Sequence, residues 1–155
     1  MIPVELSRII ISETQDTQVI VLKEKEGRRI LPIWIGLPEA LAINRRVRGE
    51  KSPRPMTHDL AADLIRGLSP GLERVTVDAF TPQGPQGGGG VFHARLHVKG
   101  GLVFDCRPSD AVALAVRLEA PIFVAEAVLA QEGQVVEEMT GEDPGTPPEL
   151  PGEPV

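Results

Sequence analysis

Residues 17–40 read TQVIVLKEKEGRRILPIWIGLPEA, and this stretch predicts two strands, a tight turn and the start of a helix. Two runs rich in β-branched and aliphatic residues, 17–24 and 28–35, flank a short polar break, which is the pattern of a β-hairpin. Gly36 ends the second run, and Pro38 is typical of the first turn of a helix. The expected order is therefore strand, strand, helix.

The residues before this stretch extend the strand pattern. Residues 3–11 alternate or cluster β-branched residues, and a polar break at 12–16 separates them from the strand that begins at Thr17. The three runs predict a three-stranded antiparallel meander. Pro32 favours an edge or bulge position in it, because proline has no backbone N–H to donate.

The residues after this stretch contain further helix and strand signals. The helix that follows Gly36 is broken by the glycine and prolines at 49–55, and later helices are expected at the caps Thr57 and Ser109. Further strands are expected at 72–80, 91–98, 102–106 and 121–125. The predicted fold class is α+β, with a mixed, mainly antiparallel sheet packed with about three helices in a single domain.

The later two helices have apolar patterns that predict their buried surfaces. The helix after Ser109 is apolar at every position from 111 to 116, which is typical of a helix buried on most sides. The helix from Thr57 repeats apolar residues at helical spacing. Its expected buried face consists of Leu60, Ala61, Leu64, Ile65 and Leu68.

Charge is unevenly placed along the chain. The formal net charge is -6, from 22 acids and 16 bases, but seven acids and no bases follow Gln131. The expected domain, residues 1–130, is nearly neutral with 15 acids against 16 bases, so the net charge does not exclude a polyanionic substrate. Residues 131–155 are acidic and proline-rich, which predicts a disordered tail, and the glycine-rich residues 81–90 predict a flexible hairpin loop.

Composition excludes several classes of protein. One Trp, four Phe and no Tyr are too few for a module that reads single strands by stacking on their bases. The single Cys106 cannot form an internal disulfide, which favours a reducing cytoplasm. No apolar run approaches the roughly 20 residues that cross a bilayer, so no membrane-spanning role is expected.

The first group of candidate site residues lies at the start of the second helix. With Thr57 as N-cap, His58 and Asp59 are expected in the first turn, exposed at the positive end of the helix dipole. His58 is a candidate general base or metal ligand, and Asp59 could orient it or bind a divalent cation. The alternative is that Asp59 only complements the dipole and His58 is a solvated surface residue.

The second group lies between a strand and the third helix. Asp105 and Asp110 flank a turn that contains Arg107. Two carboxylates near a helix N-terminus could hold Mg²⁺ or Mn²⁺, and Arg107 could bind a phosphate oxygen. The structural alternative is an ion pair of Arg107 with Asp105 or Glu39, with Asp110 complementing the helix dipole.

A basic run follows the first helix. It consists of Arg45, Arg46, Arg48, Lys51 and Arg54, with Glu50 as the only acid. Such a run attracts a phosphate backbone without reading its sequence. The alternative is that these charges only form the solvated face of a helix.

Four stretches, in this order, resemble the bifunctional nuclease domain family of bacteria and plants. They are residues 31–36 followed by Glu39 and Ala40, residues 54–60, residues 107–111 with the apolar helix, and residues 120–124. The resemblance extends over residues 1–130. It implies a compact mixed-sheet α+β domain that self-associates, here expected as a dimer, and an association with cleavage of both RNA and DNA.

The resemblance and the residue chemistry together give an enzyme hypothesis, the metal-assisted hydrolysis of phosphodiester bonds in RNA and DNA. The expected catalytic residues are His58, Asp59, Asp105, Arg107 and Asp110. Mg²⁺ or Mn²⁺ would be held by Glu39, Asp59, Asp105 and Asp110, and the nucleic acid by Arg45, Arg46, Arg48 and Arg54. The rival hypothesis is a non-catalytic binding or regulatory module that recognises an anionic ligand or a protein partner.

Overall fold

The structure is a computed structural model that describes residues 1–12, 14, 16–83, 89–137 and 153–154. Its elements, in chain order, are β1 (Ile2–Ile11), β2 (Gln18–Glu24), β3 (Arg29–Ile35), α1 (Leu37–Val47), α2 (Thr57–Leu68), β4 (Leu72–Thr81), β5 (Val91–Val98), β6 (Leu102–Cys106), α3 (Pro108–Leu118), β7 (Ile122–Val124), α4 (Glu126–Glu132), β8 (Gln134–Val135) and β9 (Glu153–Pro154). The predicted α+β class, with a mixed, mainly antiparallel sheet and about three helices, is confirmed, and the short helix α4 is the fourth among the described residues.

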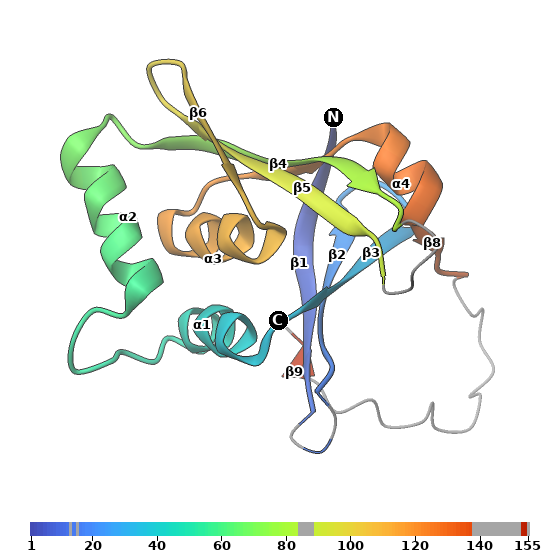
Figure 1. Ribbon diagram of the computed structural model, residues 1–155, viewed down its shortest axis with the longest axis horizontal. Helices are drawn as coiled ribbons and strands as arrows, with labels where there is room; N and C mark the ends of the chain where they lie inside the picture. Colours follow the sequence, from blue (N-terminus) through green and yellow to red (C-terminus); the bar gives the residue numbers. More distant parts are fainter. Residues whose placement is uncertain (13, 15, 84–88, 138–152, 155) are drawn as a thin grey trace.

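One sheet contains all the described strands. Their order is β6-β5-β4-β7-β1-β2-β3-β8, and β9 pairs with β1. The short strand β7 joins two antiparallel halves, because it pairs in parallel with β4 and antiparallel with β1. Figure 1 shows that the strands of the two halves run in clearly different directions, as expected of a strongly twisted sheet.

The predicted meander is confirmed. β1 pairs antiparallel with β2, and β2 pairs antiparallel with β3. β8 covers β3 only at Arg29 and Ile30. Among the described residues, Pro32 therefore lies on an uncovered edge, where its missing N–H costs no ladder hydrogen bond.

The central helix is α3, and it explains why residues 111–116 are all apolar. The side chains of its residues 111–115 are buried, and the helix packs against α1, α2, β4 and β5. Figure 1 shows α1, α2 and α3 gathered on one side of the molecule, with α4 at the other end next to β3. The two outer helices are thus held in place by α3, which itself rests on the sheet.

The predicted buried face of α2 is wrong in part. Leu60, Leu64 and Leu68 are 53%, 50% and 83% exposed, and Ala62 is the buried residue of this helix. Ala61 and Ile65 are partly buried against the core. The reason is that α2 packs on α3 through its side with small residues, and helical spacing alone does not say which apolar side a neighbour covers.

The ordered body extends past the expected boundary at Ala130. α4 continues to Glu132, and β8 pairs with β3. Most of the expected disordered tail, and residues 84–88 of the expected flexible loop, lie outside the described residues. In the part of the chain that is described, no helix has the length and apolarity needed to span a membrane.

Candidate functional site

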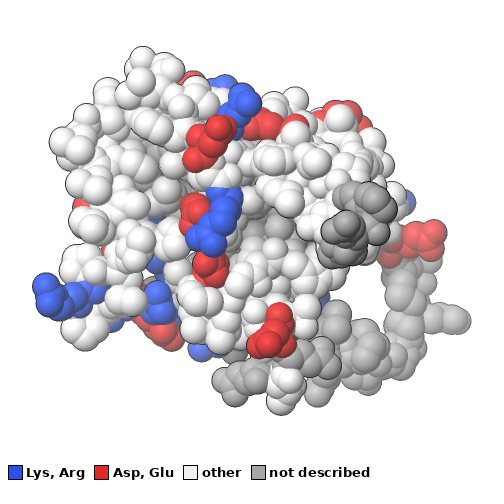
Figure 2. Space-filling view, in the orientation of Figure 1, with Lys and Arg blue, Asp and Glu red and all other residues white. Residues whose placement is uncertain are grey.

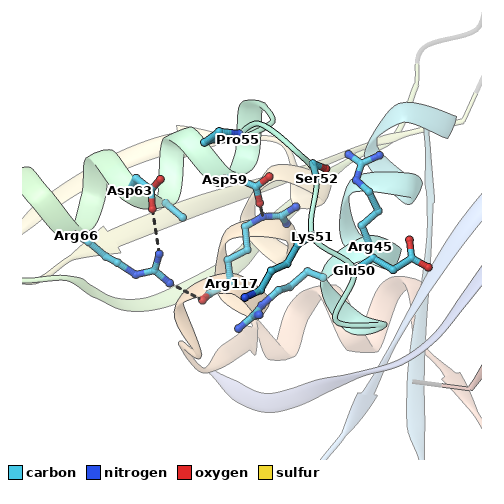
Figure 3. Close-up of a pocket in the computed structure, with 11 residues that line it drawn as sticks. Arg45, Glu50, Lys51, Ser52, Pro55, Asp59, Asp63, Arg66 and Arg117 are labelled. Atoms are coloured by element: carbon cyan, nitrogen blue, oxygen red, sulfur yellow. Dashed lines mark hydrogen bonds and ion pairs between the residues drawn. The ribbon is translucent and has the colours of Figure 1, made fainter.

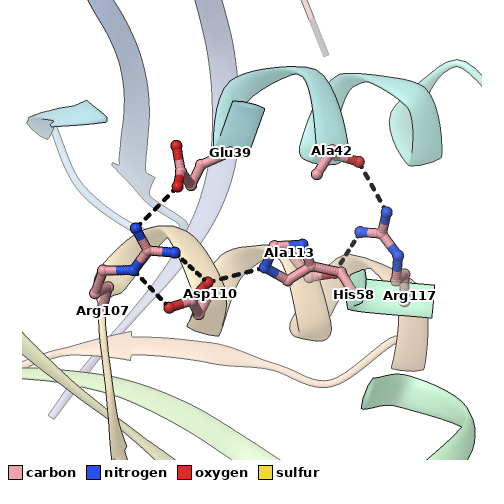
Figure 4. Close-up of polar contacts among 7 residues, drawn as sticks. All are labelled: Glu39, Ala42, His58, Arg107, Asp110, Ala113 and Arg117. Atoms are coloured by element: carbon pink, nitrogen blue, oxygen red, sulfur yellow. Dashed lines mark hydrogen bonds and ion pairs between the residues drawn. The ribbon is translucent and has the colours of Figure 1, made fainter. Parts of the chain in front are cut away.

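Three helix starts meet beside the sheet and bring four candidate residues together. Glu39 lies in the first turn of α1, His58 in that of α2 and Asp110 in that of α3, and Arg107 is the N-cap residue of α3. Figure 4 shows these side chains lying next to one another, and we call the four residues the His58 cluster. Segments far apart in the sequence thus form one polar site.

The local sequence determines where these helices begin, and both predicted caps are wrong. α3 begins at Pro108, which is favoured at a first helical position because the missing N–H needs no partner there, and Arg107 rather than Ser109 is the N-cap. Met56 rather than Thr57 is the N-cap of α2. Its backbone N–H donates to Asp59 Oδ2 at 2.9 Å, so the aspartate in the first turn satisfies the helix end.

Short hydrogen bonds connect the whole His58 cluster. His58 Nε2 lies 2.9 Å from Asp110 Oδ1. Arg107 donates to the same carboxylate twice, from Nε to Oδ2 at 2.8 Å and from Nη2 to Oδ1 at 3.0 Å. Arg107 Nη1 also donates to Glu39 Oε1 at 2.9 Å. The two bonds from one guanidinium fix the plane of the Asp110 carboxylate, which in turn holds the imidazole.

The cluster opens to solvent through its guanidinium. The side chains of His58 and Asp110 are 15% and 24% exposed, whereas that of Arg107 is 62% exposed. Figure 2 shows a band of acidic and basic side chains across one face, between surfaces that carry few charges. Gly36 makes room for the Glu39 carboxylate, since a Cβ at this glycine would collide with it.

The electrostatics keep both carboxylates of the cluster ionised. Burial alone would raise the pKa of Asp110, but hydrogen bonds from Arg107 and His58 outweigh burial and hold this pKa below its ordinary value. The pKa of Glu39 is also lowered, first by its own backbone N–H and then by Arg107. The same ion pairs raise the pKa of Arg107, which remains charged.

The ionised state of Asp110 fixes the tautomer of a neutral His58. A carboxylate without a proton can only accept, so the hydrogen on His58 must sit on Nε2. The lone pair of the imidazole is then on Nδ1, which has no hydrogen-bond partner within the described residues. This arrangement, in which a carboxylate orients a histidine, is the one used by histidines that accept protons in catalysis.

Arg107 retains donors for an anion. A guanidinium has five N–H groups. Three of them bind Asp110 and Glu39, and the remaining two, one on each terminal nitrogen, have no partner among the residues that the structure describes. These two donors on a half-exposed side chain could bind two oxygens of a phosphate group.

Asp59 does not belong to the His58 cluster. Its carboxylate accepts a hydrogen bond from Arg117 Nε at 2.8 Å, whereas His58 binds Asp110. Hydrogen bonds from Arg117 and then from the Met56 N–H lower the pKa of Asp59. Its role is therefore to close the start of α2 and to join this helix to α3.

Arg117 was missed by the sequence reasoning, although it is the buried cation of the helical layer. It is 5% exposed and donates to three helices, the first through Asp59 of α2. The other two bonds, to the Ala113 carbonyl of α3 and the Ala42 carbonyl of α1, are both 2.9 Å long and are drawn in Figure 4. A basic residue in the last turn of a helix is usually solvated and complements the negative end of the helix dipole. The local sequence around Arg117 therefore does not indicate that its side chain is buried.

Asp105 lies apart from the other candidates. It is on β6, its side chain is 93% exposed, and its nearest cation is Arg95 of β5 at 3.4 Å. Of the two ion pairs considered for Arg107, the one with Glu39 forms and the one with Asp105 does not. Asp105 points to solvent because strand alternation places it on the opposite side of β6 from Cys106.

The predicted basic run divides into two parts. Arg45, Arg46 and Lys51 line a pocket between α1, α2 and α3, on the other side of the first turn of α2 from His58. Arg48 and Arg54 are exposed and do not line it. The bases of the first part are therefore gathered in one place, and the other two are spread over the surface.

Comparison with known sequences shows the family of this chain. The bifunctional nuclease domain matches residues 20–137. This chain belongs to the bifunctional nuclease domain family. Two proteins of Mycobacterium tuberculosis, from strains CDC 1551 / Oshkosh and ATCC 25618 / H37Rv, are each 40% identical to this family member over 138 residues. The matches cover 89% of this chain and 80% of each relative, and both relatives are named as uncharacterized.

The residues expected to hold a metal in this bifunctional nuclease domain lie in three places. Glu39 and Asp110 are bridged by Arg107, Asp59 is bound by Arg117, and Asp105 is on the exposed side of β6. Within the described ranges, no group of three or more His, Cys, Asp or Glu side chains could hold a metal ion. The residues as arranged therefore do not fit the expected cation, because a guanidinium occupies the position between the two nearest carboxylates.

Cys106 supplies no nucleophile to this bifunctional nuclease domain. It is partly buried beside the start of α3. Burial, and then the nearby charges of Asp110 and Asp105, raise the pKa of its thiol to about 12. The thiol therefore stays protonated at neutral pH and has little nucleophilic character.

The lowered carboxyl pKa values predict that the bifunctional nuclease domain is acid-labile. A carboxyl whose pKa is lower in the folded than in the unfolded chain stabilises the fold above its unfolded pKa, roughly 4, and this stabilisation is lost as the pH falls through the folded pKa. We expect a thermal midpoint that is steady between about pH 7 and 5 and falls below about pH 4. Circular dichroism melts across this range test it, and a midpoint that rises on acidification would contradict it.

Proposed function

We propose that this chain is a nuclease that hydrolyses phosphodiester bonds of RNA and DNA at the His58 cluster. The observation that carries the proposal is the pairing of His58 with an ionised Asp110 beside a guanidinium that has two unused donors. Family membership supports the same class of reaction. Proton transfer and stabilisation of a negatively charged phosphorane are the two tasks that phosphodiester hydrolysis requires.

The proposed step uses side chains of the cluster. A water oxygen attacks phosphorus while His58 Nδ1 accepts one proton of this water. The bond from phosphorus to the leaving sugar oxygen breaks, and the leaving oxygen takes a proton from the imidazolium or from solvent. The products are a phosphate monoester and a hydroxyl. The free N–H groups of Arg107 bind the non-bridging oxygens, whose negative charge increases in the transition state.

The other residues of the proposal position the reacting groups or the strand. Asp110 keeps His58 in the reactive tautomer, and Glu39 holds Arg107 in place. Arg45, Arg46, Arg48 and Arg54 supply positive charge for a phosphate backbone without reading bases. Binding to this surface should therefore weaken steeply as the salt concentration rises.

An assay on the purified chain tests this function. End-labelled single strands of RNA and of DNA are incubated with the protein in EDTA, in Mg²⁺ and in Mn²⁺, and the products are separated by length. The proposal expects both substrates to be cut in at least one condition, and it expects the activity to elute with the protein through two different columns. If neither substrate is cut in any condition, the proposal is wrong.

One observation favours a second function, a non-catalytic module that binds an anion. Three acids of the enzyme hypothesis lie near α2, and each forms an ion pair with an arginine. Arg107 binds Glu39 and Asp110, and Arg117 binds Asp59. Ion pairs of this kind also hold helix ends together without any catalysis. Binding of nucleic acid without cleavage, unchanged by the loss of His58, would select this function.

We also propose that the chain pairs with a second copy through α2. Leu60, Leu64 and Leu68 lie four residues apart and form one exposed line, and Figure 2 shows a largely uncharged surface over this helix. The line is symmetric about Leu64, so two antiparallel copies of α2 can place Leu60 of one against Leu68 of the other. Such self-complementarity is what a two-fold interface requires.

Light scattering after size exclusion tests this pairing. We expect a dimer for the unchanged chain and a monomer for the double variant Leu64→Glu/Leu68→Glu, because a charge buried without a partner opposes association. Val135→Glu, which changes an exposed apolar residue of β8, is the control and should remain dimeric. A monomeric unchanged chain, or a double variant that stays dimeric, would contradict the pairing.

A further inference from the structure

A pocket with an excess of basic side chains lies between α1, the loop that follows it, α2 and α3. Its volume is about 470 Å³, and its bases are Arg45, Arg46, Lys51, Arg66 and Arg117. Figure 3 shows that Arg45, Arg66 and Arg117 come from three different helices, and we call this space the α1–α2 pocket. The volume falls in the range of about 300 to 1,000 Å³ found for small-molecule sites.

The acids of the α1–α2 pocket already have partners. Asp59 binds Arg117 at 2.8 Å, and Asp63 binds Arg66 at 3.3 Å. The third acid, Glu50, lies 4.0 Å from Arg48, which is outside the pocket. The three acids of the pocket therefore have Arg117, Arg66 and Arg48 as their nearest ion-pair partners.

Two cations of the pocket remain without a direct partner. The side chains of Arg45 and Lys51 make no hydrogen bond or ion pair with any residue that the structure describes, and the partly buried Arg45 acts on Asp59 only through its charge. The pocket as a whole has five bases against three acids, a formal charge of +2. Cations that lie in a concave site with an excess of positive charge and without a hydrogen-bonded acid favour an anion there, because binding replaces lost hydration with charge-assisted hydrogen bonds.

We propose that the α1–α2 pocket binds a phosphate group of a nucleotide or nucleic acid strand, held by Arg45 and Lys51. The Ser52 hydroxyl, which also lines the pocket, can donate a further hydrogen bond to a phosphate oxygen. Arg46 contributes charge, since it uses only Nε, at 3.3 Å, for the Val116 carbonyl. A compact site of this kind differs from a diffuse basic surface because it selects one phosphate rather than following the backbone.

The pocket has a defined position relative to the His58 cluster. His58 and Asp59 are adjacent in α2 and face the cluster and the pocket respectively. On α3, Asp110 of the cluster and Arg117 of the pocket are two turns apart, about 10 Å along the axis. If the proposed nuclease function holds, one strand would contact both sites, with the phosphate in the pocket away from the bond that is cut.

Binding measurements separate this inference from the nuclease proposal. They use the His58→Ala variant in EDTA, so that a labelled strand is not consumed, and they read fluorescence anisotropy. The probes are a short DNA strand with a 5′-phosphate, the same strand with a 3′-phosphate, and the strand with neither. Inorganic phosphate serves as a competitor.

The double change Arg45→Gln/Lys51→Gln is expected to weaken binding about tenfold or more, because two charge-assisted hydrogen bonds are lost. The control Arg28→Gln/Lys99→Gln removes the same residue types and the same charge from exposed turns that do not line the pocket, and should change affinity about twofold or less. Binding that prefers a phosphorylated end would assign the site to a phosphate monoester, and equal binding of all strands would assign it to an internal diester.

Two outcomes would overturn the inference. One is an equal loss of affinity in the pocket variant and the control variant, which would show that only overall charge matters. The other is strand binding that neither the pocket variant nor inorganic phosphate reduces. Both outcomes leave the cleavage assay untouched, so the pocket and the nuclease proposal can fail independently.

Discussion

Replacing Asp110 with asparagine is expected to lower the rate constant for phosphodiester cleavage by about 10² to 10⁴-fold. An asparagine amide can donate to His58 Nε2, which would move the imidazole hydrogen to Nδ1 and remove the lone pair that accepts the proton from water. The change also removes the charge that holds Arg107. Since the side chain keeps its shape and size, the fold should be retained.

Single-turnover cleavage across a range of pH measures this effect. Because Asp110 acts through His58, the loss should fall on the rate constant rather than on the substrate concentration at half-maximal rate. The pH dependence of the remaining activity should also differ from that of the unchanged chain. Asp16→Asn, in the exposed turn between β1 and β2, is the matched control and should keep full activity. An active Asp110→Asn variant with an unchanged pH profile would remove the proposed role of the pair.

Replacing Arg117 with alanine is expected to destabilise the fold by about 2 to 4 kcal/mol. The guanidinium is buried and joins α1, α2 and α3, so its loss removes the hydrogen bonds to the Ala42 and Ala113 carbonyls and leaves a cavity between the helices. The Asp59 carboxylate would also lose its cation, although its side chain is 38% exposed and water compensates in part.

Urea unfolding followed by circular dichroism checks this value. The midpoint should fall with little change in slope, as expected for a loss of stability without a change in the surface exposed on unfolding. Arg28→Ala removes an exposed arginine from the turn before β3 and should change stability by less than about 0.5 kcal/mol. An Arg117→Ala midpoint equal to that of the control would mean that this arginine does not hold the helices together.

Much of the fold could be predicted because its signals are local. The turn between β2 and β3, the proline near the start of α1 and the unbroken apolar run of α3 each act over a few residues, and the structure confirms the elements they predict. The exposed side of α2 could not be predicted in this way. Leu64 and Ile65 both fit a helical repeat, and only the position of α3 decides which of them is covered.

The candidate site was predicted in part for a related reason. Polar residues at helix starts can meet when the helices converge, and His58, Arg107, Asp110 and Glu39 do so. Asp59 follows His58 in the sequence, and Asp105 lies two residues before Arg107. The helical turn nevertheless directs Asp59 to Arg117, and strand alternation directs Asp105 to the exposed side of β6 beside Arg95. Arg117 gave no signal because its importance arises from carbonyl groups of α1 and α3, which no side-chain pattern shows.

The central claim is that His58 accepts a proton during phosphodiester cleavage, and the most direct measurement compares the cleavage rate of the unchanged chain with that of His58→Ala, purified side by side. We expect cleavage of a labelled strand by the unchanged chain and a rate lower by about 10² to 10⁴-fold in the variant, with both proteins folded at the assay temperature by circular dichroism. Equal rates for the two proteins would contradict it.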